Sequence, residues 1–157
     1  MKKDTLRIIS PNGHLGFAPT KEESFWLGAA TKPDYYCCDS GSDDIGPVPL
    51  GADKCASHPE HQKHDLELML IAAREQNVPM IIGSSGDTGT NSRVDMYVGF
   101  IKEIAKKHNM KPFKLAYFYS EVPVEEIRTR MENGSVIEGS TMDLRVTDGA
   151  GKPISGA

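Results

Sequence analysis

Short runs of apolar residues alternate along this chain with longer segments in which apolar residues recur at steps of three and four. Short runs rich in β-branched and aromatic residues are typical of strands, and the longer spacing is typical of helices. The pattern predicts strands at 6–9, 34–38, 78–82 and 113–119. It predicts helices at 21–31, 58–77, 93–108 and 123–133. Such alternation indicates an α/β fold with an open, mainly parallel sheet and helices on both faces, a three-layer, Rossmann-like arrangement.

Two of the predicted helices begin with the spacing of a capping box. In this motif a serine and an acidic residue three positions later bind each other's backbone amides. Ser57 with Glu60 has this spacing before the second helix, and Ser92 with Asp95 has it before the third. We therefore expect these two serines to cap their helices.

The length of the chain, 157 residues, fits one compact domain. Because the apolar pattern weakens after residue 134, we predict a single α/β domain over 1–146 and a flexible or truncated tail over 147–157. A net charge of -4 without a basic cluster argues against nucleic-acid binding. The chain has neither an apolar run of the ~20 residues that span a bilayer nor an apolar signal segment, so we predict a cytoplasmic protein without a membrane partner.

The strongest candidate for chemistry is the loop between the third predicted strand and the third predicted helix. Its glycines allow backbone amides to turn inward, its hydroxyl groups add donors, and the helix N-terminus adds partial positive charge. We predict that this loop binds an anionic substrate or cofactor, with an ordinary tight turn as the alternative. The predicted contacts are Gly83, Ser84, Ser85, Gly86, Thr88, Gly89, Thr90 and Asn91. The loop matches neither the nucleotide P-loop nor the dinucleotide fingerprint.

Two further polar loops follow the first two predicted strands, and parallel strands bring such loops to one edge of a sheet. Asn12 and Gly13 lie in the first loop, where we expect them to extend the binding site. His14 lies beside them and is a candidate general acid or base, with capping of its own loop as the alternative. Asp43 and Asp44 lie in the second loop and are candidate ligands of a divalent cation, with a solvated turn as the alternative.

Two carboxylates complete the predicted catalytic set with His14. Asp87 lies within the glycine-rich loop, where it could act as a base, orient a substrate hydroxyl or hold a metal. Glu121 follows the fourth predicted strand and should reach the same edge of the sheet. His14, Asp87 and Glu121 are therefore the predicted acid and base residues.

Histidines and cysteines elsewhere in the chain carry weaker signals. His58, His61 and His64 recur at steps of three, which spreads them around a helix and favours solvated positions over a shared metal ion. The adjacent Cys37 and Cys38, with Cys55, have neither a metal-binding spacing nor a paired disulfide pattern. We assign the cysteines no chemistry, and for the histidines an ion shared by two neighbours stays the alternative to solvated positions.

Three segments of the chain resemble a known family. Residues 7–17 (RIISPNGHLGF), 39–47 (DSGSDDIGP) and 81–89 (IIGSSGDTG) look like the amino-terminal part of the acyclic terpene utilisation protein A family. The resemblance covers about residues 5–122 and implies work on an acyl-CoA or a related carboxylate, without a settled catalytic residue. Members of that family are several hundred residues long, so the resemblance implies a fragment, a split subunit or a shortened relative.

Together these features predict a small-molecule enzyme or enzyme subunit. The substrate would be an anionic acyl-CoA, phosphorylated compound or carboxylate, bound at the carboxyl edge of the sheet and processed by acid and base chemistry. One alternative is a non-catalytic ligand-binding or partner subunit, and another is a metal-dependent hydrolase that uses the aspartate and histidine loops. We expect a homo-oligomer or a subunit of a larger complex.

Overall fold

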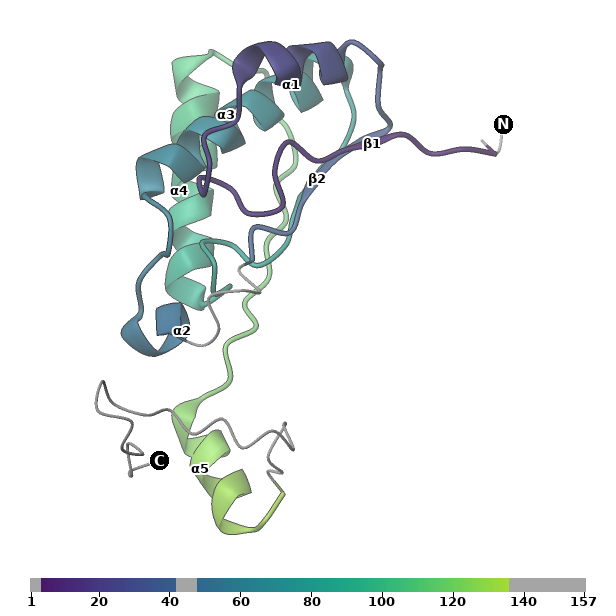
Figure 1. The fold of residues 1–157 in the computed structure, drawn as a ribbon. Coiled ribbons are helices and arrows are strands. Elements are labelled where there is room, and N and C mark those ends of the chain that lie inside the picture. The colour runs from purple at the N-terminus through teal and green to yellow at the C-terminus, as the bar shows by residue number, and fades with distance from the viewer. Residues whose placement is uncertain (1–3, 42–47, 136–157) are drawn as a thin grey trace, which may run out of the picture. The chain divides into compact units, whose positions relative to one another are not determined.

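The computed structural model describes residues 4–41 and 48–135 (Figure 1). The chain divides into two compact units, Met1–Glu121 and Val122–Ala157. In the first unit the elements follow in the order β1 (Ile8–Ile9), α1 (Glu22–Ala29), β2 (Tyr35–Cys38), α2 (Val48–Ala52), α3 (Pro59–Gln76), β3 (Met80–Ile82) and α4 (Asn91–Lys107). The predicted domain limit at residue 146 lies outside the described residues.

The three strands form one open parallel sheet in the order β1-β2-β3. Ile8 pairs with Tyr35, and Cys37 pairs with Ile81. The prediction of an α/β fold with an open parallel sheet is confirmed. Because the strand order does not reverse, right-handed crossovers carry successive helices to the same side of the sheet.

The hydrophobic core lies on one face of this sheet. Tyr36 and Cys38 point from β2 into this core, where they join Phe25 of α1, Leu66 of α3 and Ile101 of α4. The side chains that alternate with them along the strands lie on the opposite face, as the period of two in a strand requires.

That opposite face of the sheet is open within the described residues. Ile8 and Ile81 are each more than half exposed there. The helix layer that was expected on this second face therefore stays a prediction.

Helix α3 is capped at both ends by residues that flank it in the chain. The ring nitrogen Nδ1 of His58 accepts a hydrogen bond of 3.2 Å from the backbone N–H of Glu60, and Pro59 occupies the first helical position, where no amide donor is needed. Asn77 ends the helix in the left-handed conformation. The predicted capping role of Ser57 is wrong, because its hydroxyl is buried and donates instead to the carbonyl oxygen of Leu15.

Helix α4 also begins differently from the prediction. Its N-cap is Thr90, whose side chain makes no capping hydrogen bond. The backbone N–H of Asn91 instead donates to Oε2 of Glu121 over 3.0 Å. The predicted box of Ser92 and Asp95 is therefore absent from this helix start, since a carboxylate distant in the chain takes the place of a local cap.

The predicted fourth strand over 113–119 is wrong. These residues form no regular element, and no backbone hydrogen bond joins the described residues 111–121 to the sheet. A strand needs a ladder partner, and β3 pairs with β2 alone. The aromatic side chains of Tyr117, Phe118 and Tyr119 are instead at least half exposed.

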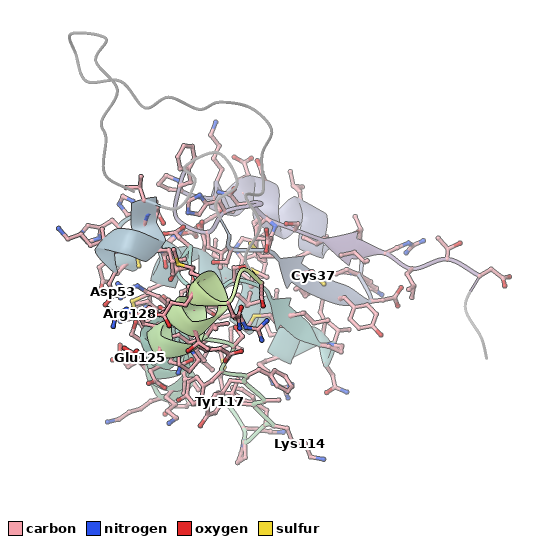
Figure 2. The ribbon with its side chains drawn as sticks, turned by 90° about the horizontal axis from the view of Figure 1, so that it is seen from below. Cys37, Asp53, Lys114, Tyr117, Glu125 and Arg128 are labelled. Atoms are coloured by element: carbon pink, nitrogen blue, oxygen red, sulfur yellow. The ribbon has the colours of Figure 1, made fainter. Side chains whose placement is uncertain are left out.

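The second unit contains α5 (Val124–Glu132), in agreement with the predicted fourth helix. Its side chains are exposed, and it carries two ion pairs of helical spacing. Arg128 lies 2.8 Å from Glu125, both of which are labelled in Figure 2, and Arg130 lies 2.6 Å from Glu126. Such pairs support an isolated helix by about 0.2–0.5 kcal/mol each.

Candidate functional site

The three loops that follow the strands meet at the carboxyl edge of the sheet. The backbone N–H of Ser40, after β2, donates to the carbonyl of Gly13, after β1, over 3.1 Å. The N–H of Asp87, after β3, donates to the carbonyl of Ser40 over 3.1 Å. These two hydrogen bonds show the expected convergence of the three loops among the described residues.

The loop after β3 follows a backbone path that explains its glycines. A Cβ on Gly83 would lie 2.6 Å from the carbonyl oxygen of Asp39, closer than real contacts allow. Gly86 and Gly89 adopt positive φ angles of 59° and 64°. Asp87 does so too, at 74°, which is uncommon for a residue with a side chain.

Several polar groups of the same loop remain open to a ligand. The backbone amides of Ser84, Ser85 and Thr88 make no hydrogen bond to another described residue. The hydroxyls of Thr88 and Thr90 lie 3.2 Å apart, and Thr90 is 3.1 Å from the hydroxyl of Ser92 at the start of α4. Backbone amides that bind no other described residue, together with these hydroxyls, form a surface suited to an anion.

His14 and Asp87 are in direct contact, although they lie far apart in the chain. Nε2 of His14 faces Oδ1 of Asp87, and the side chain of Asp87 is fully buried while that of His14 is 14% exposed. The other oxygen of Asp87 accepts a hydrogen bond of 2.6 Å from the backbone N–H of Ala56. Two of the three predicted catalytic residues therefore form one imidazole–carboxylate pair with limited access to solvent.

Asn12 shapes the loop that presents His14. Its side-chain oxygen accepts from the backbone N–H of His14 at 3.2 Å, and its nitrogen donates to the carbonyl of Ala18 at 3.0 Å. The ring of His14 stacks on Phe17, with 5.4 Å between centroids. Both ends of the Asn12 side chain thus form hydrogen bonds within the loop. Gly13, the next residue, is exposed.

A buried polar network that the sequence analysis missed supports Asp87 from behind. Gln62 of α3 and Tyr97 of α4 are its centre: the hydroxyl of Tyr97 donates to Oε1 of Gln62 at 3.0 Å and lies 2.7 Å from the hydroxyl of Ser40. Nε2 of Gln62 donates to the hydroxyl of Ser57 at 2.7 Å and reaches Oδ2 of Asp87 at 3.4 Å. Burial raises the pKa of the Tyr97 hydroxyl, so it stays protonated as a donor.

The apolar periodicity of α3 and α4 is a sequence signal that points to this network. Gln62 lies four positions before Leu66, in the buried stripe of α3, and Tyr97 lies in the apolar repeat of α4. A polar group on a buried helical face must find a partner. The periodicity shows the face, but the partners come from loops that are distant in sequence.

Asp65 holds the first loop from the same helix. Its side chain is fully buried, and its two oxygens accept hydrogen bonds from the backbone N–H groups of Gly16 at 2.9 Å and Thr20 at 3.0 Å. A Cβ on Gly16 would lie 2.5 Å from the backbone nitrogen of Gln62, so loop and helix are in close contact. This clamp fixes the loop that carries His14.

Glu121, the third predicted catalytic residue, has a different position. Its carboxylate is exposed and accepts from the first helical amide of α4, where the helix dipole favours a negative charge. The structure shows a contact of Glu121 with Asn91 and none with His14 or Asp87 among the described residues. Glu121 therefore closes the end of the binding loop.

The predicted metal ligands Asp43 and Asp44 lie outside the described residues. Within the described ranges no three histidine, cysteine, aspartate or glutamate side chains gather in a way that could hold a metal ion. His58 caps α3, and His64 lies between Asp65 and Glu22. Of the three helix histidines, His58 and His61 are exposed and His64 is partly buried.

The cysteines are also without a predicted role, and burial weakens their acidity. The pKa of Cys38 is raised to about 11, chiefly by burial, and its thiol donates to the carbonyl of Asn12 at 2.8 Å. Burial also raises the pKa of the Cys55 thiol. Thiolate nucleophiles need a lowered pKa, so neither cysteine is prepared for that chemistry.

A cleft of about 540 Å³ continues from the binding loop along α4. Gly83, Ser84 and Thr88 line its polar end, and Ile82, Val98 and Leu115 line its apolar walls. The volume lies in the range of ~300–1,000 Å³ that small-molecule sites occupy.

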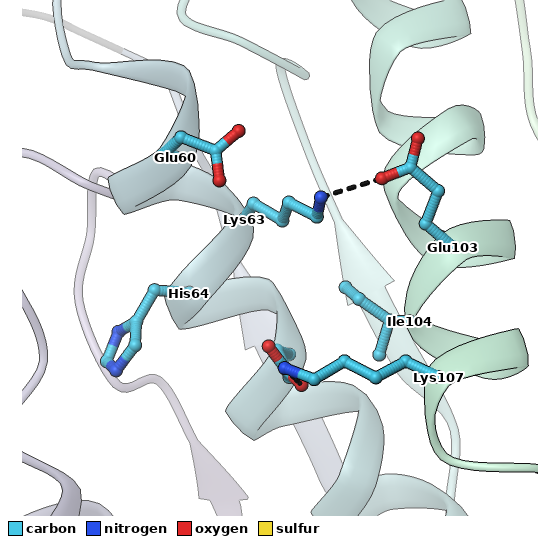
Figure 3. Close-up of a pocket in the computed structure, with 7 residues that line it drawn as sticks. Glu60, Lys63, His64, Glu103, Ile104 and Lys107 are labelled. Carbon is cyan, nitrogen blue, oxygen red and sulfur yellow. Dashed lines mark hydrogen bonds and ion pairs between the residues drawn. The ribbon is translucent and has the colours of Figure 1, made fainter.

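A second cleft, of about 380 Å³, lies between α3 and α4 (Figure 3). It is lined mainly by charged side chains, among which Lys63 pairs with Glu103 and Lys107 pairs with Glu67. Because these charges already have partners, we assign this second cleft no binding role.

Comparisons with family models, with curated proteins and with solved structures found no match. No helix in the described ranges combines the length and the apolarity that crossing a bilayer requires. The function of the chain must therefore be argued from the site itself.

Proposed function

We propose that this protein binds an anionic small molecule at the carboxyl edge of its sheet and transfers a proton to or from it through His14 and Asp87. The observation that carries the proposal is the contact between Nε2 of His14 and the fully buried carboxylate of Asp87. A buried carboxylate beside an imidazole orients the ring and stabilises its protonated form. The pair supports catalysis better than a surface ion pair would, because solvent reaches it poorly.

The direction of the contacts around Asp87 defines the chemistry of the pair. Oδ2 of Asp87 accepts hydrogen bonds from Ala56 and Gln62, and Oδ1 faces His14. The carboxylate would then accept a hydrogen bond from an N–H at Nε2 of His14. Nδ1 would be the nitrogen that exchanges a proton with the substrate. A substrate proton would pass to Nδ1, and Asp87 would stabilise the resulting imidazolium.

The anionic part of the substrate is proposed to bind the loop of Ser84 to Thr90. The amides of Ser84, Ser85 and Thr88, which bind no other described residue, supply donors without a charged side chain, and such donors suit a phosphate or a carboxylate. The apolar walls of the adjoining cleft supply space for a hydrocarbon portion. This combination supports the acyl-CoA or related carboxylate that resemblance to the acyclic terpene utilisation protein A family implies.

A second candidate function, a ligand-binding partner subunit without catalysis, is favoured by the open face of the sheet. Ile8 and Ile81 expose apolar side chains there, and parallel sheets are normally covered on both faces. We propose that a further copy of this chain or a partner subunit covers this face and completes the three-layer arrangement. No observation on the described residues favours the metal-dependent hydrolase.

Binding to the loop is tested by titrating the protein with inorganic phosphate and with coenzyme A. We expect saturable binding, and we expect Ser85→Glu to weaken it at least about tenfold, because a carboxylate beside the free amides repels the anion. The matched control is Thr31→Glu, which adds the same charge at an exposed position before β2, on the opposite edge of the sheet. Absence of saturable binding, or equal losses in both variants, would contradict the proposal.

Catalysis is separated from binding by the variant Asp87→Asn. We expect it to retain phosphate binding but to abolish turnover of any acyl substrate that the native protein converts, since an amide cannot stabilise the imidazolium. A native protein that binds coenzyme A compounds and converts none of them would favour the partner-subunit function.

A further inference from the structure

We propose that Gln62 and Tyr97 are positioning residues that fix which nitrogen of His14 carries its proton. This inference rests on the proposed acid and base role of His14 and Asp87, but its test needs no substrate. The two residues lie on α3 and α4, behind Asp87, and are buried. Tyr97 also lines the inner wall of the cleft that adjoins the binding loop.

The orientation of the Gln62 amide follows from a chain of hydrogen bonds that begins at a backbone carbonyl. The carbonyl oxygen of Leu15 can accept only, so the hydroxyl of Ser57, 3.0 Å away, must donate to it. The oxygen of Ser57 then accepts from Gln62 at 2.7 Å, which requires the NH₂ end of the amide on that side. The same NH₂ group reaches Oδ2 of Asp87 at 3.4 Å.

Tyr97 fixes the other end of the amide. Its hydroxyl donates to Oε1 of Gln62 at 3.0 Å, and the hydroxyl of Ser40, at 2.7 Å, supplies the hydrogen bond that the oxygen of Tyr97 accepts. Burial raises the pKa of this tyrosine, so its proton stays in place to hold Oε1. The amide is therefore held at both ends in one orientation.

The orientation of the Gln62 amide affects His14 through Asp87. The NH₂ end of Gln62 and the N–H of Ala56 are both directed at Oδ2 of Asp87, so this oxygen receives two donors. Oδ1 faces Nε2 of His14 and is the acceptor available for a proton on that nitrogen, and a neutral ring with its proton there carries none on Nδ1. A rotated amide would direct a carbonyl oxygen at Asp87, and two facing acceptors would require one of them to move or to bind a proton.

The test is ¹⁵N and ¹H nuclear magnetic resonance of the full chain labelled at histidine. In the native protein we expect a slowly exchanging proton on Nε2 of His14 and an unprotonated Nδ1. In Tyr97→Phe we expect this proton to exchange with water about tenfold faster, because the loss of one neutral hydrogen bond frees the amide to rotate. In Gln62→Glu, which keeps the shape but replaces the NH₂ group by oxygen, we expect the Nε2 signal to disappear.

Tyr36→Phe is the matched control. Tyr36 is as deeply buried as Tyr97, but its hydroxyl makes no hydrogen bond to this network. Its variant should leave the His14 signals unchanged, and circular dichroism should show that each variant is folded. The proposal is overturned if Nδ1 carries the proton in the native protein, or if folded Tyr97→Phe and Gln62→Glu both keep the native signal.

The two proposals fail separately. If phosphate and coenzyme A do not bind while the variants alter the Nε2 proton as expected, the proposed function is wrong and the positioning role stands. If both ligands bind and the Nε2 proton is insensitive to Gln62 and Tyr97, the positioning role is wrong.

Discussion

The two sides of helix α3 differ in how they use polar residues. On the inner side, Gln62 and Asp65 are fully buried and bind specific groups of the first loop and of Asp87. On the outer side, Lys63 pairs with Glu103 of α4 at 2.6 Å, but these side chains are 27% and 63% exposed (Figure 3). The donor–acceptor distances on both sides are within hydrogen-bonding range, but the side chains differ in their exposure to solvent.

This difference shows that burial, more than distance, decides the energetic weight of a polar contact. An exposed ion pair exchanges one well-solvated state for another and contributes little. A buried donor or acceptor that loses its partner also loses the water that could replace that partner. We therefore expect substitutions on the buried side of α3 to lower the free energy of unfolding strongly. Substitutions on its exposed side should change it little.

The largest effect is expected for Asp65→Ala. The backbone amides of Gly16 and Thr20 would lose their acceptor, and the first loop would lose its attachment to α3. We expect a loss of about 3 kcal/mol in the free energy of unfolding, from one buried and one part-buried donor left without an acceptor and from a small cavity. Urea denaturation followed by circular dichroism measures it, and a loss below about 1 kcal/mol would show that solvent replaces the carboxylate.

A smaller effect is expected for Gln62→Leu. The apolar side chain is similar in size, but it leaves the hydroxyls of Ser57 and Tyr97 with one partner fewer inside the protein. We expect a loss of about 2 kcal/mol in the free energy of unfolding. The same denaturation experiment measures it. A variant as stable as the native protein would mean that this network is not needed for folding, which would sharpen the case for its role at His14.

A pH-dependent effect is expected for His64, which lies at the boundary of the two sides. Burial lowers the pKa of its imidazole, but hydrogen bonds to Asp65 and Glu22 raise it, and the net pKa lies above the ordinary value of 6.5. A group whose pKa is raised by folding stabilises the folded protein. For His64 this stabilisation is complete below pH 6.5 and is lost as the pH rises through the pKa of the folded state.

We therefore expect His64→Ala to reduce stability more at about pH 5.5 than at about pH 8.5. The ring is 39% exposed, so screening by solvent limits the difference to a few tenths of a kcal/mol. Thermal melts of both proteins at the two pH values measure it. A larger loss at the higher pH would reverse the assigned sign.

The smallest effect is expected for Glu103→Ala on the outer side. Its ion pair with Lys63 is exposed, and exposed pairs contribute about 0.2–1 kcal/mol. We expect a change below about 0.5 kcal/mol, which should shrink further at high salt. A loss comparable to that of Gln62→Leu would remove the contrast between the two sides of α3.

Much of the fold could be predicted from the sequence. The continuous apolar run near Ile81 and the helical spacing of α4 are local patterns, and local patterns suffice to recognise parallel strands and amphipathic helices. The segment 113–119 has the same apolar and aromatic character but forms no strand, because strand formation also needs a partner edge. The cap of α4 was missed for a related reason, since Glu121 comes from outside the helix.

By itself the sequence determined strands β1 to β3 and helices α1, α3, α4 and α5, the position of the polar loops after the strands, and the glycines that let the loop after β3 turn. Each of these depends on residues that are close together in the chain. Only the tertiary structure decided that His14 meets Asp87, that Glu121 does not join them, and that Gln62 and Tyr97 lie behind the pair. These contacts depend on strand register and on how loops cross the sheet edge, and such long-range geometry is not encoded in any local spacing.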